Sequence, residues 1–105
     1  MRRGDIYLCD LGDPVDPEQG YRRPVVIVSH DETVSYGLPI VVPMTRSKRG
    51  YPTHVEIDGV LPVTSYAQCE QLRAISVSRL TRHLGTLSAV ELVRIESVIR
   101  RLLSP

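Results

Sequence analysis

Two neighbouring arginines stand where a loop meets a strongly apolar segment, a place at which a cation can be held against a substrate. Arg22 and Arg23 follow a stretch rich in proline, glycine and acidic residues, and Pro24 opens the apolar run 25–28. A guanidinium presents a planar fork of donors that matches the oxygens of a phosphate or a carboxylate. The same arginines could instead form ion pairs with the acidic residues of the loop, which stabilise a protein only weakly.

Two further places combine polar side chains with positions in strands. Thr45 and Arg46 come at the end of an apolar strand and offer a hydroxyl and a cation. A threonine is also common at ordinary turns, so this place alone does not define a site. Gln71 and Arg73 are two residues apart, a spacing that puts both on one face of a strand. That face could equally be a solvated surface.

Composition argues against several other kinds of site. The 105 residues carry 13 Lys+Arg and 12 Asp+Glu, so the net charge of +1 lacks the basic excess of a common nucleic-acid-binding module. The three histidines stand at no metal-binding spacing. Cys9 and Cys69 are isolated, which is typical of small buried side chains in a reducing cytoplasm. We therefore expect neither a metal nor a cofactor.

The length and the hydropathy pattern indicate one globular domain, residues 1–105. Hydrophobic residues make up 42% of the chain, enough for one core. No apolar stretch approaches the length of a membrane span, and residues 1–3 continue into Gly4 and Asp5 rather than into an apolar signal segment. We expect a cytoplasmic protein that does not contact a membrane.

Hydrophobic periodicity predicts the elements that position the candidate residues. Alternating or β-branched runs predict strands over 6–11, 24–28, 40–42 and 53–57. The second should be central in its sheet, because it is apolar on both faces. Pro43 should end the third, since proline cannot donate to a ladder. Residues 66–75 are extended but ambiguous in pattern, and 12–20 form a loop.

The C-terminal part changes to a helical period. Ser88 and Glu91 form a capping box that begins a helix. The apolar positions that follow helical spacing, and are expected to face the core, are Ala89, Leu92, Val93, Ile95, Ile99, Leu102 and Leu103. The predicted fold is α+β, a curved antiparallel sheet whose open face is closed by the C-terminal helix.

Taken together and in order, the motifs resemble those of the MazF/PemK family of toxin endoribonucleases. The matching segments are Arg3-Gly4-Asp5-Ile6-Tyr7, Glu18-Gln19-Gly20, Arg23-Pro24-Val25-Val26-Ile27-Val28, Pro43-Met44-Thr45, Gln71-Leu72-Arg73-Ala74-Ile75, Arg79-Leu80, Leu84-Gly85 and Leu87-Ser88. Two positions depart from the usual pattern, since Tyr7 replaces the commoner Trp and Met44 replaces Leu. The resemblance covers nearly the whole chain.

The resemblance implies an SH3-like small barrel with a C-terminal helix, a homodimer, and an RNA groove at the dimer surface. It implies a cognate antitoxin, MazE-like or of another fold, whose acidic segment occupies that groove. The substrate would be single-stranded RNA, in the first place messenger RNA, with ribosomal and transfer RNA as alternatives. Cutting it would inhibit translation and growth.

Site residues follow from the same resemblance, position by position. The catalytic arginine and threonine of the family fall on Arg23 and Thr45. The residues expected to bind RNA are Glu18, Gln19, Arg22, Arg46, Lys48, Arg49, Gln71 and Arg73. The loops 12–19 and 46–52 are where family members differ most, so they are expected to set base preference.

The chemistry can be argued without the family. RNA carries its own nucleophile, the 2′-OH, so an enzyme need only align it and stabilise the phosphorane. The products would be a 2′,3′-cyclic phosphate and a free 5′-OH. Arg23 suits electrostatic stabilisation and could also act as the acid, but it is a poor base at neutral pH because arginine stays protonated. Glu18, Thr45 and a water molecule remain candidates for the base.

Two other classes of function compete with an endoribonuclease. The CcdB toxins, which poison gyrase without being enzymes, are similar in fold to this family, but that activity does not need Arg23 and Thr45. An SH3-like binding module usually has an aromatic groove, whereas this chain has 5 Tyr and no Trp or Phe.

Overall fold

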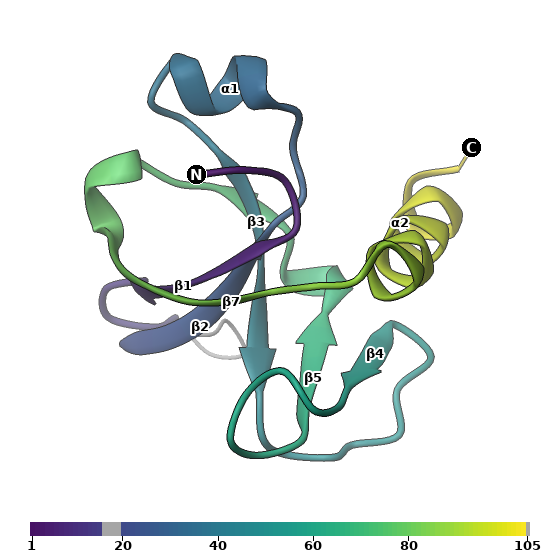
Figure 1. Ribbon diagram of the computed structural model, residues 1–105. Coiled ribbons are helices and arrows are strands. Elements are labelled where there is room, and N and C mark those ends of the chain that lie inside the picture. Colours follow the sequence, from purple (N-terminus) through teal and green to yellow (C-terminus); the bar gives the residue numbers. More distant parts are fainter. Residues whose placement is uncertain (16–19, 105) are drawn as a thin grey trace.

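The computed structural model describes residues 1–15 and 20–104 (Figure 1). Its strands and helices, in chain order, are β1 (Asp5–Asp10), β2 (Arg22–Ile27), α1 (Asp31–Ser35), β3 (Ile40–Thr45), β4 (His54–Ile57), β5 (Ser65–Gln68), the 3₁₀ helix η1 (Cys69–Gln71), β6 (Arg73–Ala74), the 3₁₀ helix η2 (Val77–Arg79), β7 (Leu80–Thr86) and α2 (Ala89–Leu103). Among the described helices, none is long and apolar enough to cross a membrane.

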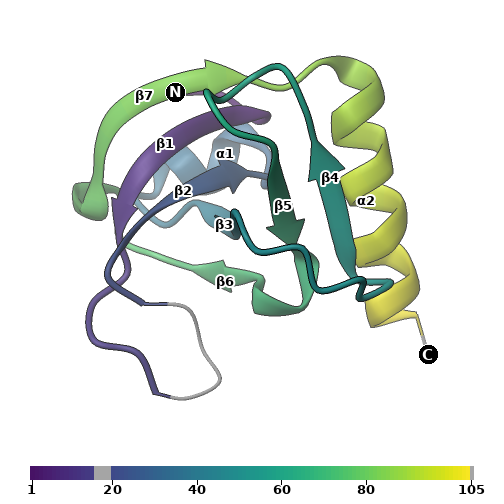
Figure 2. The same ribbon diagram turned by 90° about the horizontal axis from the view of Figure 1, so that it is seen from below.

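The strands form one curved antiparallel sheet. Their order is β4-β5-β3-β2-β1-β7, and β6 adds to β3. Figure 2 shows the strands from β7 to β5 curling around a common interior, with α2 standing beside β4. The predicted α+β fold, a curved antiparallel sheet with a C-terminal helix, is confirmed.

Strand β2 occupies the middle of the sheet, as the sequence predicts. It pairs with β1 on one side and with β3 on the other. Val25, Val26 and Ile27 are fully buried. Val26 contributes to the larger of two hydrophobic clusters, whereas Val25 and Ile27 contribute to the smaller one. Because the later residues of β2 are buried on both faces, they fix the backbone of Arg22 and Arg23, with which the strand begins.

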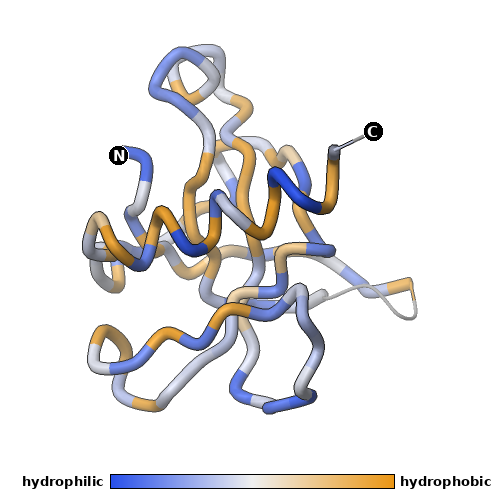
Figure 3. Tube along the Cα trace, turned by 90° about the vertical axis from the view of Figure 1, so that its right-hand side faces the viewer, coloured by the Kyte–Doolittle hydropathy of each residue, from blue (hydrophilic) through white to orange (hydrophobic). Residues whose placement is uncertain are grey.

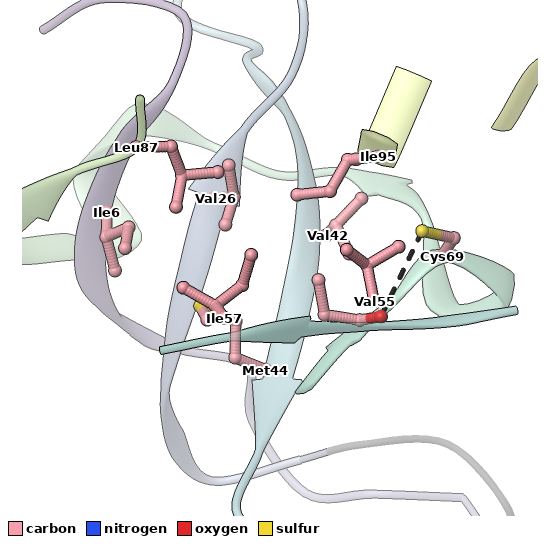
Figure 4. Packing of buried hydrophobic residues seen from close by; sticks show 10 residues of the cluster. Ile6, Val26, Val42, Met44, Val55, Ile57, Cys69, Leu87 and Ile95 are labelled. Atoms are coloured by element: carbon pink, nitrogen blue, oxygen red, sulfur yellow. Dashed lines mark hydrogen bonds between the residues drawn. The ribbon is translucent and has the colours of Figure 1, made fainter. Parts of the chain in front are cut away.

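The larger cluster fills the space between the sheet and α2. Figure 4 shows Ile95 of α2 close to Val42 and Val55, side chains from the helix and from two strands. The helix begins as predicted, because Ser88 Oγ accepts the N–H of Glu91 and Glu91 Oε1 accepts the N–H of Ser88.

The predicted apolar face of α2 is only partly correct. Ile95 is buried and Leu92 and Ile99 are half-buried, and the hydropathy of α2 alternates along its length in Figure 3. Four of the positions assigned to the core are exposed instead: Ala89, Val93, Leu102 and Leu103. Periodicity overestimated the buried face because α2 lies at the side of the sheet and contacts it along a narrow stripe.

Three expectations about the strands are wrong. Pro43 does not end β3, because it falls between the part of β3 that pairs with β6 and the part that pairs with β5. Residues 66–75 are not one extended stretch but β5, η1 and β6. Gln71 and Arg73 therefore do not share a strand face, since Gln71 ends a 3₁₀ helix. Helix α1 and strand β7 were not predicted.

Candidate active site

A groove of about 640 Å³ opens where the ends of β2 and β3 meet the loop before β5. Its lining contains arginines, hydroxyl groups and aliphatic side chains. The lining residues are Leu8, Arg22, Arg23, Pro24, Met44, Thr45, Arg46, Ser47, Leu61, Pro62, Val63, Ser65, Arg82 and Leu84. Four of the residues predicted from the sequence are thus brought together: Arg22, Arg23, Thr45 and Arg46.

Strand pairing brings the first residues of β2 and the last residues of β3, which include Arg23 and Thr45, to the same groove. Val25 of β2 pairs with Pro43 of β3 in an antiparallel ladder. Beyond that pair, Thr45 pairs with Tyr66 of β5 and Arg23 pairs with Cys9 of β1, and both Thr45 and Arg23 line the groove. Because both strands are anchored in the core, both residues start from a well-fixed backbone at the groove wall.

The backbone just before the arginines is held in an uncommon conformation. Tyr21 has a φ of 59°, in the left-handed region that non-glycine residues rarely adopt. Its N–H donates to the carbonyl of Gly12 at 2.6 Å, and its own carbonyl accepts the N–H of Leu11 at 2.8 Å. These two bonds fix the start of β2, and so the point from which Arg22 and Arg23 project. Strained backbone of this kind is found preferentially at functional sites.

The groove carries positive charge without compensation from the described lining. It includes four arginines and, among the lining residues named above, no Asp, Glu or His. No described carboxylate lies within ion-pair distance of these four, whereas Arg3 pairs with Glu96 elsewhere on the surface. The alternative of ion pairs between Arg22 or Arg23 and Asp13 is not observed. The other loop carboxylates lie outside the described residues.

Arg23 also has a donor that its described neighbours leave unused. Its Nε is buried and has no hydrogen-bond partner among the described residues. A buried donor without a partner costs on the order of 1–3 kcal/mol. Because Arg23 lines the groove, its guanidinium can still donate to an anionic ligand there.

Thr45 contributes a buried hydroxyl to the same groove. The residue is 6% exposed, and its Oγ1 accepts the N–H of Ser47 at 3.2 Å. An oxygen that accepts this bond keeps its own hydrogen, which it can donate to a ligand. Together, Arg23 and Thr45 can donate several hydrogen bonds to one phosphate.

Four of the described residues that were predicted to bind RNA do not line the groove. Lys48 and Arg49 are exposed in the loop after β3. Gln71 lies in η1, and Arg73 pairs with Val41 at the far end of β3. Glu18 and Gln19 lie outside the described residues, so the structure says nothing of them.

Sequence reasoning missed part of the groove. Arg82 of β7, the hydroxyls of Ser47 and Ser65, and the segment 61–63 all line it. Ser47 follows the predicted Arg46 directly and could have been included on proximity alone. The others are brought in by pairing between distant parts of the chain, for which the local sequence carries no pattern.

The two cysteines are structural, as their isolation predicts. Both thiols are free and buried, and burial raises the pKa of Cys9 and of Cys69 to about 11. A thiol with a raised pKa is a poor nucleophile at neutral pH. Within the described part of the chain, no group of three or more His, Cys, Asp or Glu could hold a metal ion.

Comparisons with known proteins agree with these features. Residues 2–103 match the family described as PemK-like, MazF-like toxin of type II toxin-antitoxin system. The chain is 34% identical to endoribonuclease MazF9 of Mycobacterium tuberculosis over 110 aligned residues, which cover 95% of this chain and 93% of that protein.

Solved structures show the same fold. The crystal structure of MazF from Deinococcus radiodurans matches with a TM-score of 0.88 and 24% identity, over 100% of this chain and 97% of that chain. A crystal structure of MazE-MazF from the same organism matches with a TM-score of 0.83 and 25% identity, over 98% of this chain and 95% of that chain. The chain therefore belongs to the PemK/MazF toxin family of type II toxin-antitoxin systems.

Proposed function

We propose that this toxin is an endoribonuclease that cuts single-stranded RNA, with messenger RNA as the first candidate, and that a cognate antitoxin neutralises it. The observation that carries the proposal is the groove that four arginines and a buried threonine hydroxyl line, with no carboxylate among the described lining residues. Such a groove suits a polyanion. The relative named endoribonuclease MazF9 and the solved MazE-MazF structure support it.

In the proposed reaction, Arg23 and Thr45 act on the scissile phosphate. The guanidinium and the hydroxyl donate to its nonbridging oxygens and stabilise the charge that develops as the 2′-OH attacks. The base takes the proton of the 2′-OH as the 2′-oxygen bonds to phosphorus. The P–O5′ bond breaks, and the departing O5′ takes a proton from Arg23 or from water, which leaves a 2′,3′-cyclic phosphate and a free 5′-OH. Of the three candidates for the base, Thr45 is the one that lies among the residues the structure describes. Glu18 and a water molecule remain the other two.

The other assigned residues would bind the RNA chain around that phosphate. Arg22 and Arg46 line the groove, which supports a role for both in contacting phosphates next to the scissile one. Lys48 and Arg49 extend the positive charge outward along the loop. The assignments of Glu18, Gln19, Gln71 and Arg73 stay predictions, and the groove of a single chain does not include Gln71 or Arg73.

The setting of the proposed activity follows from its substrate. We infer one toxin domain over residues 1–105, working in the cytoplasm, where messenger, ribosomal and transfer RNA are found. We also infer a homodimer, because isologous two-fold assemblies are the commonest and α2 leaves Val90 and Val93 exposed. The reaction needs no metal, since the nucleophile belongs to the RNA.

Neither competing function explains the groove as well. A non-enzymatic gyrase poison has no use for a buried threonine hydroxyl in the same groove as an arginine. A peptide-binding SH3-like module would present aromatic side chains, but the apolar part of the described lining is aliphatic.

Cleavage of RNA without metal is the first prediction. Purified protein incubated with a long RNA and EDTA should give discrete fragments, because the substrate provides the nucleophile and Arg23 and Thr45 provide the stabilisation. Gel electrophoresis of the products measures the outcome, with a DNA of the same sequence as the control that should stay intact. RNA that remains uncut, with or without divalent metal, would contradict the proposal.

Competition between antitoxin and RNA is the second prediction. An acidic antitoxin segment in the arginine-lined groove would occupy the positions that phosphates take, so RNA binding should weaken as antitoxin is added. An antitoxin with fewer acidic residues in that segment should bind worse, most visibly at low salt. Titrations by fluorescence anisotropy measure both effects. Unchanged RNA binding in the saturated complex would indicate that the antitoxin acts from another surface.

A further inference from the structure

The fourth arginine of the groove, Arg82 of β7, belongs to none of the motifs that carry the family resemblance. It is exposed and lines the groove together with Leu84 of the same strand. We propose that Arg82 binds a second phosphate of the RNA backbone, separate from the one held by Arg23 and Thr45. This inference rests on the proposed function and adds to it a position that fixes the path of the RNA.

Pairing of three strands places Arg82 in line with the start of β2. Leu8 of β1 pairs with Pro24 of β2 on one side and with Arg82 of β7 on the other, and all three line the groove. Neighbouring strands are about 4.8 Å apart, so the backbone of Arg82 lies roughly 10 Å from that of Pro24, which directly follows Arg23. An RNA strand that passes over Leu8 would meet Arg23 on the β2 side of Leu8 and Arg82 on the β7 side.

The backbone of β7 is irregular on both sides of Arg82. Twice along this strand, one step on β1 corresponds to two steps on β7, so that Thr81 and Leu84 are the extra residues. Irregularities of this kind bend a strand and change the direction of the nearby side chains, and they are frequent beside active sites. The part of β7 that faces the groove is thus shaped differently from a regular edge strand.

The guanidinium of Arg82 is available to a ligand. It has no hydrogen bond or ion pair with any residue in 1–15 or 20–104. By contrast, Arg79 donates to the carbonyl oxygen of Asp10 at 3.4 Å, and Arg3 pairs with Glu96. Between Arg82 and Arg23 the lining is apolar, with Leu8 and Pro24 at its centre. An unpaired cation beside an apolar surface suits a phosphate whose sugar or base packs on that surface.

Binding of an uncleavable RNA tests this position. The probe is a fluorescent, mixed-sequence, single-stranded 2′-O-methyl RNA, whose blocked 2′-oxygen prevents cutting. Arg82→Gln should weaken binding about tenfold, the scale of one lost hydrogen bond to a charged group. The slope of log K against log salt should become shallower by about 0.7, which corresponds to one fewer phosphate contact. Arg2→Gln removes the same charge from an exposed residue outside the groove and should leave both quantities unchanged.

Cleavage kinetics separate a binding role from a catalytic one. Arg82→Gln should raise KM about tenfold and leave kcat close to that of the wild type, because a remote phosphate contact is the same in the ground state and the transition state. Arg82→Lys should restore the salt slope while recovering only part of the affinity, since an ammonium lacks the planar fork.

Four outcomes would overturn the inference. The first is that Arg82→Gln binds as tightly as the wild type, the second is that it loses no more affinity than Arg2→Gln, and the third is that it lowers kcat with KM unchanged. If the wild type neither binds nor cuts RNA, the proposed function fails as well. If the wild type cuts RNA and Arg82→Gln matches it, only the role of Arg82 is wrong.

Discussion

Arg23→Ala should lower the rate of RNA cleavage by about 10²–10³-fold, the usual effect of removing one preorganised donor from developing charge. The guanidinium lines the same groove as Thr45, and its buried Nε has no partner among the described residues. Because no described residue depends on that side chain for an ion pair, the substitution should leave the fold intact. Single-turnover cleavage of a labelled RNA measures the loss.

Two controls locate this effect at Arg23. Arg22→Ala removes an adjacent, exposed cation and should act mainly through KM, with kcat retained. Sedimentation should show wild type and both variants as the same dimer, twice the 11.8 kDa of the chain. Near-wild-type cleavage by Arg23→Ala would move the chemistry to Arg22 or Arg73, and a monomeric wild type at micromolar concentration would contradict the homodimer.

The companion substitution Thr45→Val keeps the shape of a buried side chain and removes its hydroxyl. Cleavage should fall about tenfold or more, since one hydrogen bond to a charged phosphate is lost. Some stability should also be lost, because the N–H of Ser47 loses its acceptor. Thr45→Ser retains the hydroxyl and should keep most of the activity. Equal losses in the serine and valine variants would indicate that packing, not the hydroxyl, matters at this position.

The parts of the fold that the sequence predicts are those determined by nearby residues. The buried strand β2 was recognisable from its β-branched run, and the start of α2 from Ser88 and Glu91, which bond to each other across three residues. Helix α1 has only five residues, too few for a period to be read. Strand β7 is half exposed and interrupted by two irregularities, so its hydrophobic pattern does not alternate.

The residues of the candidate site also divide into those that the local sequence predicts and those that only the fold brings together. Arg23 and Thr45 were found because each stands in a short motif at the end of a predicted strand. Arg82 was not found, because only the pairing of β7 with β1 brings it to the groove. Gln71 and Arg73 were placed on a common strand face by their spacing, yet the chain turns through a 3₁₀ helix between β5 and β6. Sequence spacing predicts which residues share a face within one strand or helix. It fails where the chain passes from one element to the next.

Replacing a single ribose by deoxyribose immediately 5′ to the scissile phosphate should abolish cleavage at that bond. The missing 2′-OH is the nucleophile of the proposed reaction, and Arg23 and Thr45 can only stabilise an attack that the substrate itself supplies. Binding of the substituted RNA should remain close to that of the unmodified strand, because most of its affinity comes from phosphates. Cleavage and anisotropy assays on the same two oligonucleotides measure both properties, and a deoxyribose placed one nucleotide further along serves as the matched control.

The ends of the products give an independent check on the same step. Attack by the 2′-OH leaves a 2′,3′-cyclic phosphate on the upstream fragment and a free 5′-OH on the downstream one, which a polynucleotide kinase can label directly. Attack by water would instead give no cyclic phosphate, because the new P–O bond would then be made to the oxygen of water. A 5′-phosphate on the downstream fragment, or cutting of the deoxy-substituted strand, would show that water is the nucleophile. The roles assigned to Arg23 and Thr45 would then have to be replaced by ones that position and deprotonate water.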